Sequence, residues 1–441
     1  MRRVALVAPH FPPSNLAGVH RARLWAQHLH EFGWQPVIVT THWKYYEENL
    51  DWELCELLDP ELKIIRTRAI STKPVRVVGD IGIRAFMWHL ATLRRLFQQG
   101  QIDFLHITIP SFYSALLGQA LYRNGPIAFG IDYIDPWVHV WPEAEIPFSK
   151  AWLSMRLGRI LEPHAVRNAS LITGISEGYY AGVLERNRRL DQSAVAAAMP
   201  YGNSARDFES VRRNLRKSYL FDPKDGKFHF VYAGAMLPRA YLVLDCLFTA
   251  LAFMKTEHPD FFSKIRFHFI GTGKSPDDPE GYNILPQSRR FDVAEVVTEH
   301  PQRIPYLDAL SHLVQATAIL ILGSTEPHYS PSKIYQSVEA RRPIFALLHE
   351  SSTAFTVLRE SNAGVAIPVN ETVFPEPTVL AQNLMSFMGN TQYNEQTVNW
   401  SKFSAYSARE SARKLSEALD SALENFGHRI KSGKKPPSSI A

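Results

Sequence analysis

Two neighbouring residues, Ser332 and Lys333, stand where the chain could bind an anion. They follow an apolar run at 318–322 that predicts a buried parallel strand, and they open a short helical segment. The start of a helix presents unpaired backbone amides, and the lysine adds a cation. The pair therefore predicts a phosphate site, and the phosphate of a nucleotide is the first hypothesis.

Two other loops of the same half of the chain contain glycine directly after a predicted strand. Gly234 would let a ligand approach the backbone closely, and Arg239 could clamp an anion with its guanidinium group. Gly271 belongs to a Gly-Thr-Gly turn, which is weak evidence alone. Because the carboxyl ends of parallel strands meet at one edge of a sheet, these loops and Lys333 are expected to converge.

Three positions in the first half could serve a second substrate or the chemistry itself. Gly18 lies in a Pro-rich loop after the first strand, where a ligand could bind or the chain could merely turn. Asp135 could orient a hydroxyl or accept its proton, although an aspartate before a proline also often caps a turn. His106 could titrate near neutral pH, but a lone histidine is more often a satisfied core residue.

The elements that position these residues follow a regular order. Strand-like apolar runs alternate with helical patterns through both halves, which predicts parallel sheets covered on both faces. The predicted strands cover 4–8, 36–40, 62–67, 104–107, 127–131, 171–173, 228–233, 265–270, 318–322, 344–348 and 364–367. The fold class is thus α/β, with two doubly wound, Rossmann-like domains.

The turn-rich segment 199–203 predicts the joint between these domains. We expect one domain over 1–203 and the other over 204–403. A last amphipathic helix is predicted over 404–426, and the basic, Pro/Ser-rich stretch 427–441 is predicted to be disordered.

Composition narrows the class of protein. The chain has 441 residues, of which 45% are hydrophobic and 21% charged, as in a soluble globular protein. Cys55 and Cys246 are far apart and show no metal-binding spacing, which favours a reducing cytoplasm. A net charge of +5 without a nucleic-acid-binding signature favours anionic small molecules or a membrane surface over nucleic acid.

Residues 76–97 predict a helix rich in aromatic and arginine side chains. Such a helix could lie on an anionic membrane, at its inner face. The alternative is a core helix with solvated basic residues, which the wide spread of its apolar positions favours. No apolar segment reaches the length of a membrane span.

Together these residues resemble a GT-B glycosyltransferase, in particular the large retaining group called family 4. The resemblance runs from Arg3 to about Leu423, as short pieces in the family's order. These pieces are the Pro-Pro loop with Gly18, Asp135-Pro136-Trp137, Thr173 to Glu177, Pro200-Tyr201-Gly202, Gly234, Gly271-Thr272-Gly273, Ile304-Pro305-Tyr306, and Pro331-Ser332-Lys333 with Arg342-Pro343. It implies two Rossmann-like domains facing each other across a cleft, with the last helix crossing back to the first domain.

The resemblance also implies roles. The acceptor would bind mainly to the first domain, and the nucleotide sugar mainly to the second. Residues implied at the donor diphosphate are Gly18, Gly234, Arg239, Ser332 and Lys333. Those implied at the nucleoside are Gly271, Ile304, Pro305 and Gln336, while His106 and Asp135 would lie beside the sugar or the acceptor.

The implied reaction transfers a sugar from a nucleoside-diphosphate sugar to a saccharide or lipid-linked acceptor, in glycan biosynthesis. Retention of the anomeric configuration is implied by family only. Fixed positive charges would stabilise the departing diphosphate, so we expect no metal and no cofactor.

Two rival classes stay open. One is a non-catalytic protein of the same fold that binds a nucleotide sugar or a glycan. The other is a GT-B epimerase or a phosphorylase, and a phosphorylase would need a lysine-bound pyridoxal phosphate, which no sequence feature demands.

Overall fold

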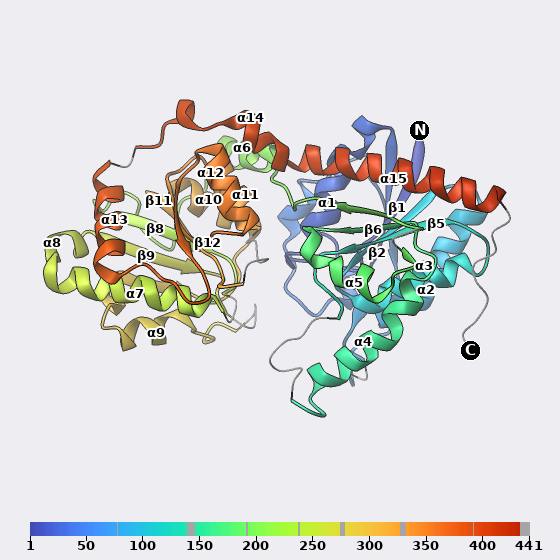
Figure 1. Ribbon diagram of the computed structural model, residues 1–441, viewed down its shortest axis with the longest axis horizontal. Coiled ribbons are helices and arrows are strands. Elements are labelled where there is room, and N and C mark those ends of the chain that lie inside the picture. The colour runs from blue at the N-terminus through green and yellow to red at the C-terminus, as the bar shows by residue number, and fades with distance from the viewer. Residues whose placement is uncertain are drawn as a thin grey trace. The chain divides into compact units, whose positions relative to one another are not determined.

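The computed structural model describes residues 1–76, 78–138, 146–190, 193–236, 239–273, 278–326, 332–390 and 392–432. The chain forms two compact units, each built around its own parallel sheet (Figure 1). The N-unit comprises Met1–Gly202 with Ala408–Ala441, and the C-unit comprises Asn203–Ser407.

The N-unit contains a seven-stranded sheet in the order β3-β2-β1-β4-β5-β6-β7, and all pairs are parallel. Its strands are β1 (Arg2–Val7), β2 (Trp34–Thr41), β3 (Lys63–Thr67), β4 (Phe104–Ile109), β5 (Ala128–Tyr133), β6 (Leu171–Gly174) and β7 (Val195–Ala198). The order reverses between β1 and β4. Open α/β sheets bind ligands at the carboxyl ends of the strands beside such a switch point.

Helices cover both faces of this sheet. On one face lie α1 (Val19–His28) and α15 (Ala408–Lys431); on the other lie α2 (Ile81–Gln98), α3 (Leu116–Tyr122) and the carboxyl end of α4 (Lys150–Val166). Alternate residues of one strand serve the two cores: Leu105 faces α2, α3 and α4, whereas Phe104 faces α1 and α15. Burial on both faces explains why the strands are continuous apolar runs. A short α5 (Ala181–Arg186) precedes β7.

The last helix differs from its prediction in length. Residues 404–406 form a separate 3-10 turn, and α15 begins at Ala408. It continues to Lys431, so the first residues of the predicted disordered tail are helical; 433–441 lie outside the described residues. Basic side chains favour the carboxyl end of a helix, and Arg429 Nη2 donates to Ser170 Oγ at 2.7 Å. Leu415 and Leu419 bury this helix in the N-unit.

The C-unit contains a six-stranded sheet in the order β10-β9-β8-β11-β12-β13, again all parallel. Its strands are β8 (Phe228–Ala233), β9 (Ile265–Ile270), β10 (Val297–His300), β11 (Ala318–Leu322), β12 (Ile344–His349) and β13 (Val365–Val369). The switch point lies between β8 and β11. Two parallel sheets with this order confirm the predicted fold class of two doubly wound α/β domains.

The C-unit sheet is also covered on both faces (Figure 1). Alternate strand residues such as Phe230 and Phe345 pack on α7 (Ala240–Glu257) and α13 (Pro377–Asn390). The other face carries α10 (Tyr306–Gln315), α11 (Lys333–Glu339) and α12 (Thr353–Ser361). The remaining helices are α6 (Ala205–Arg213), α8 (Pro259–Phe262), α9 (Ile284–Arg290) and α14 (Trp400–Phe403).

A chain of hydrogen bonds links two buried histidines inside the C-unit. His229 Nε2 lies 2.8 Å from Asp225 Oδ1, and His229 Nδ1 lies 2.9 Å from His268 Nε2. His268 Nδ1 lies 2.7 Å from Thr298 Oγ1. The carboxylate of Asp225 accepts the proton on His229 Nε2, so His229 Nδ1 faces His268 across the next hydrogen bond. Burial lowers the pKa of His268 to about 3.

We therefore expect the protein to lose stability in mild acid. The folded pKa of His268 lies below the unfolded value of 6.5, so the unfolded state binds more protons between pH 6.5 and 3. Titration of His268 alone should lower the free energy of unfolding by ~1.4 kcal/mol per pH unit across this window. Denaturant titrations at pH 7.0, 5.5 and 4.5 measure the slope. His268→Gln should reduce this slope by the amount that one proton contributes. An unchanged slope would show that the titration of His268 is not its cause.

Candidate functional site

The ammonium group of Lys333 lies at the switch point of the C-unit. Nζ is 3.6 Å from the centroid of the Tyr232 ring on β8. It also lies beside Gly234, where an added Cβ would be 3.3 Å from it. Nζ is buried and has no hydrogen-bond partner within the described part of the chain. Burial lowers the pKa of Lys333 to about 7.

This environment leaves Lys333 incompletely satisfied. The ring of Tyr232 compensates part of the lost hydration, but the three N–H donors of an ammonium need acceptor atoms. An oxygen-rich anion beside Gly234 would supply them. Gly234 has φ 126°, a conformation that other residues rarely adopt, and a side chain there would crowd Nζ. The position therefore needs glycine for both its backbone and its space.

The other predicted anion contacts lie at the same edge of the sheet. Arg239 caps α7, and its Nη1 is 3.6 Å from Glu326 Oε1 in the loop after β11. Its side chain is 52% exposed, so it can turn toward a ligand. Ser332 is exposed and precedes α11 without a capping hydrogen bond from its side chain. Since α11 has only seven residues, the cation matters more here than the helix end.

Pro331 and the rest of the segment 327–331 lie outside the described residues.

The four predicted nucleoside contacts also gather at this edge. Gly271 has φ 70°, and an added Cβ there would be 3.9 Å from the Cα of Arg303, which precedes Ile304. Pro305 immediately precedes α10 and is exposed. Gln336 lies one turn of α11 after Lys333, and its Nε2 is 3.5 Å from the hydroxyl of Tyr306. Tertiary structure thus brings three loops and one helix together, as the strand order predicts.

Glu299 was missed by the sequence interpretation and fixes the Gly271 loop. Its Oε1 accepts a hydrogen bond from Thr272 Oγ1 at 2.6 Å. Its carboxylate also accepts the backbone N–H groups of residues 283–285, at 2.8 to 3.0 Å. A carboxylate at the start of α9 is electrostatically favourable. Its isolated place in a polar strand gave no signal for this role.

In the N-unit, His106 lies inside the core. It is fully buried on β4, its ring is 5.5 Å from that of Trp25, and Nε2 is 3.3 Å from Thr173 Oγ1. Burial lowers its pKa to about 4, so the ring is neutral near pH 7. This matches the core-histidine alternative, and we derive no catalytic role for it. Sequence could not show that α1 would cover this strand position.

A buried ion pair lies beside His106. Nε and Nη2 of Arg21 donate to the two carboxylate oxygens of Asp132, each at 3.0 Å, and both side chains are fully buried. Arg21 Nη1 also donates to the carbonyls of Met199 and Pro200, at 2.8 and 2.7 Å. The pair ties α1 to β5 and to the turn at the end of the N-unit.

Asp135 and Gly18 remain accessible in the N-unit. Asp135 follows β5 and is exposed to solvent, although dense protein around it desolvates the carboxylate and raises its pKa. Gly18 has φ −60° and ψ −23°, so its backbone does not require glycine. An added Cβ would meet nothing within 4 Å, which leaves room for a ligand.

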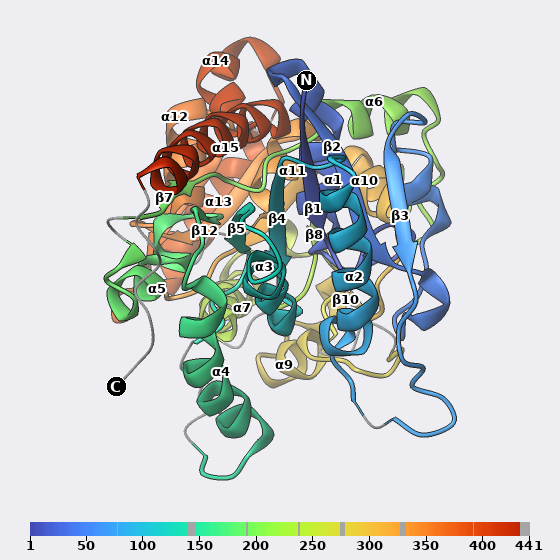
Figure 2. The ribbon, with the colours of Figure 1, turned by 90° about the vertical axis from the view of Figure 1, so that its right-hand side faces the viewer.

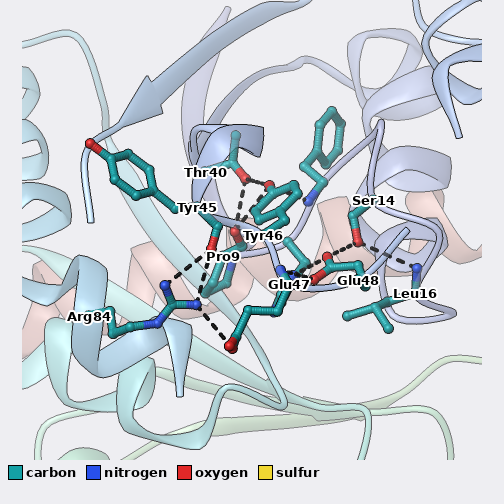
Figure 3. A network of polar contacts seen from close by, with 11 residues as sticks. Pro9, Ser14, Leu16, Thr40, Tyr45, Tyr46, Glu47, Glu48 and Arg84 are labelled. Carbon is teal, nitrogen blue, oxygen red and sulfur yellow. Dashed lines mark hydrogen bonds and ion pairs between the residues drawn. The ribbon is translucent and has the colours of Figure 1, made fainter. Parts of the chain in front are cut away.

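A polar network fixes the loops after β1 and β2 (Figure 3). His10 Nδ1 lies 2.6 Å from Glu48 Oε1, and Ser14 Oγ donates to the same oxygen. Burial would raise the pKa of Glu48, but the hydrogen bond and charge of His10 outweigh it, so the pKa is lowered. Arg84 Nη1 and Nη2 donate to the carbonyl of Tyr45, each at 3.1 Å. The contact with Glu48 thus fixes the imidazole of His10 in the loop after β1, beside the switch point of the N-unit.

The helix predicted within residues 76–97, for which a core position was favoured over a membrane surface, packs largely in the core. It begins at Ile81 rather than 76, because Asp80 Oδ1 accepts the N–H of Ile83 at 2.9 Å and caps it. Its buried apolar side chains include Leu90, Leu93 and Leu96, and its exposed ones are Ile83, Met87 and Trp88.

No helix in the described ranges has the length and apolar character needed to cross a bilayer. Among the same residues, no group of three or more His, Cys, Asp or Glu side chains is placed to hold a metal ion.

Solved structures share this architecture over the whole chain. A sucrose-phosphate synthase from Thermosynechococcus elongatus has a TM-score of 0.57 at 13% identity, covering 98% of this chain and 99% of its own. HepE from Anabaena, solved with UDP and glucose, has a TM-score of 0.56 at 12% identity, covering 98% and 100%. A putative UDP-N-acetylglucosamine 2-epimerase from Listeria monocytogenes has a TM-score of 0.51 at 12% identity, covering 100% and 99%.

These likenesses establish the fold, which is that of the GT-B glycosyltransferases. No protein-family model matches the chain. No curated protein matches it by sequence either. Membership of the retaining family 4 stays a prediction.

Proposed function

We propose that the protein is a glycosyltransferase that moves a sugar from a nucleoside-diphosphate sugar to a saccharide or lipid-linked acceptor. The observation that carries this proposal is the buried ammonium of Lys333, which lies beside Gly234 at the switch point of the C-unit and has no hydrogen-bond partner among the residues that the structure describes. A diphosphate is the kind of ligand that satisfies such a group. A shared fold with HepE, solved with UDP and glucose, supports the same class of donor.

In this proposal an acceptor hydroxyl oxygen bonds to the anomeric carbon as the bond from that carbon to the diphosphate oxygen breaks. Negative charge grows on the departing diphosphate, which takes up the hydroxyl proton. Lys333 and Arg239 stabilise that charge, because fixed cations in a dry site interact with it strongly. Ser332 and Gly234 complete the diphosphate contact. Gly271, Ile304 and Pro305 contact the base through the backbone, while Gln336 donates to a ribose hydroxyl.

The N-unit is proposed to bind the acceptor, with Asp135 beside it, and Gly18 is proposed to contact the donor diphosphate. Side-chain cations take the place of a metal, and no cofactor takes part. Retention of configuration, a role in polysaccharide biosynthesis and a cytoplasmic location at the inner face of the membrane complete the proposal. Membrane contact through residues 76–97 would use Met87 and its exposed neighbours.

Two observations keep the rival functions in view. A carboxamide, Gln336, bonds a ribose hydroxyl less strongly than a carboxylate would, which suits a protein that only binds nucleotide sugars. The Listeria protein shows that an enzyme described as an epimerase shares the fold. Release of nucleoside diphosphate that depends on an acceptor distinguishes a transferase from both.

A titration with nucleoside diphosphates tests the proposal. A thermal-shift screen identifies the base, and calorimetry then measures affinity from pH 7.0 to 8.5. Because Lys333 has a pKa of about 7 when unliganded, binding at pH 7 should take up about half a proton. Above pH 7.5 the affinity should fall by up to about tenfold per pH unit.

Lys333→Arg is the matched control, since a guanidinium stays charged throughout this range. This variant should bind without proton uptake and without the loss of affinity at high pH. Failure of every nucleoside diphosphate to bind would contradict the proposed function. If the affinity of the unaltered protein does not change with pH, Lys333 does not contact the diphosphate.

A further inference from the structure

The amino-terminal part of α4 carries an apolar stripe on the face opposite its packed face. The packed face includes Gly158, Ala165 and Val166. On the other face lie Leu153, Leu157 and Ile160, which are 53%, 41% and 63% exposed. Spacings of four and three residues align them along one side of the helix. This helix is therefore apolar on two opposite sides, and only one of them is covered.

The helix is firmly held at its other end. Glu162 is buried and pairs with Arg186 through two hydrogen bonds of 2.9 and 3.0 Å. From this anchor α4 projects beyond the other helices of the N-unit, as both views show (Figures 1 and 2). The apolar stripe thus stands on a rigid, outward-pointing element.

The residues before α4 extend the apolar surface. Ile146 is 60% exposed and Phe148 is 82% exposed. Phe148 has φ 63°, an uncommon conformation for a bulky residue, and its ring lies 5.3 Å from that of Trp152. Two aromatic rings at the tip of an exposed helix are typical of side chains that sit at the boundary between water and lipid.

Positive charge flanks the stripe. Lys150, Arg156 and Arg159 are exposed, and no acidic residue occurs from 146 to 161, so this segment carries three positive charges. The guanidinium of Arg156 lies 4.9 Å from the centroid of the Trp152 ring. Long basic side chains beside an apolar stripe can reach anionic headgroups while the stripe enters the acyl region.

We propose that the segment 146–160 docks on an anionic phospholipid bilayer. An exposed apolar patch of this kind marks an interaction site, and its charge complements acidic lipid headgroups. A second copy of this chain is a poorer occupant, because a two-fold interface would place three positive charges against three. The proposal does not depend on the glycosyltransferase activity.

Co-sedimentation of the full chain with vesicles tests it. Vesicles of phosphatidylcholine with phosphatidylglycerol should bind the protein, and pure phosphatidylcholine should bind it at least about tenfold more weakly. Leu157→Gln with Ile160→Gln should lower binding by about tenfold or more, because both apolar contacts are lost. Arg156→Gln with Arg159→Gln should remove the preference for anionic vesicles. All four side chains are exposed, so these variants should fold normally.

Met87→Gln tests the exposed apolar side chain of α2, and Leu215→Gln in the C-unit is the matched control, since Leu215 is also an exposed leucine, at 50%. This control should leave vesicle binding unchanged. Binding that is lost in Met87→Gln but kept in the α4 variants would assign the contact to α2 and overturn the proposal. Absence of binding to anionic vesicles would also overturn it, as would a dimer in solution that the α4 variants abolish.

Discussion

Replacing Lys333 with alanine should lower turnover by about 100- to 1,000-fold, the usual loss when one fixed donor to a developing anion is removed. The reason is the position of its ammonium, which is buried at the switch point of the C-unit and lacks any acceptor among the described residues. Affinity for the nucleoside diphosphate should fall as well, by about tenfold or more. Initial rates of nucleoside diphosphate release, measured with the donor found by screening, quantify the loss.

Lys333→Met separates the charge from the packing. The methionine side chain keeps an apolar stem over the Tyr232 ring but has no ammonium group. We therefore expect this variant to be as inactive as the alanine variant. Below pH 7 it should nevertheless raise the melting temperature of the unliganded protein, because it removes a buried charge that has no counterion within the described part of the chain. Lys224→Ala, at an exposed position of the C-unit, is the control and should match the unaltered protein. Near-normal turnover in Lys333→Met would exclude Lys333 as the diphosphate contact.

Breaking the Arg21–Asp132 pair should destabilise the N-unit by about 3 to 5 kcal/mol, the cost of leaving one buried charge without its partner. Among the described residues, Arg21→Met leaves the carboxylate of Asp132 with a single side-chain hydrogen bond, from Thr173 Oγ1 at 2.7 Å. The carbonyls of Met199 and Pro200 lose a donor in the same change. Chemical denaturation followed by tryptophan fluorescence measures the effect.

The double variant Arg21→Met/Asp132→Asn should recover part of this loss, since no charge is then buried. Arg2→Gln provides the control: Arg2 pairs with Asp420 at the surface, with both side chains about half exposed, and its loss should cost less than about 1 kcal/mol. A loss of similar size in Arg2→Gln and Arg21→Met would contradict the assignment of the large effect to burial.

Much of the fold could be predicted because burial on both faces leaves a continuous apolar run for each central strand. The bounds predicted for β8, β9 and β11 agree with the structure to the residue. Strands β7 and β10 were missed, since Val195–Ala198 is a run of small residues and Val297–His300 is mostly polar. Both lie at an edge of their sheets, where the apolar signal is weakest.

The candidate site was predictable in one respect and not in another. The strand order determines which loops meet, so Gly234, Gly271 and the start of α11 could be grouped from the sequence alone. The environment of each side chain could not be predicted in this way. His106 is the clearest example, because its strand position gave no sign that Trp25 would cover it.

By itself the sequence determined two doubly wound sheets and the loops at their carboxyl edges, since local periodicity encodes which faces of each element are buried. Only the tertiary structure decided that Lys333 Nζ packs on the Tyr232 ring without a hydrogen-bond partner in the described ranges, and that Arg21 meets Asp132, 111 residues away in the chain. The exposure of the apolar stripe of α4 is likewise visible only in the tertiary structure. The physical reason is that charge pairing and exposure depend on contacts between distant elements, which no local pattern records.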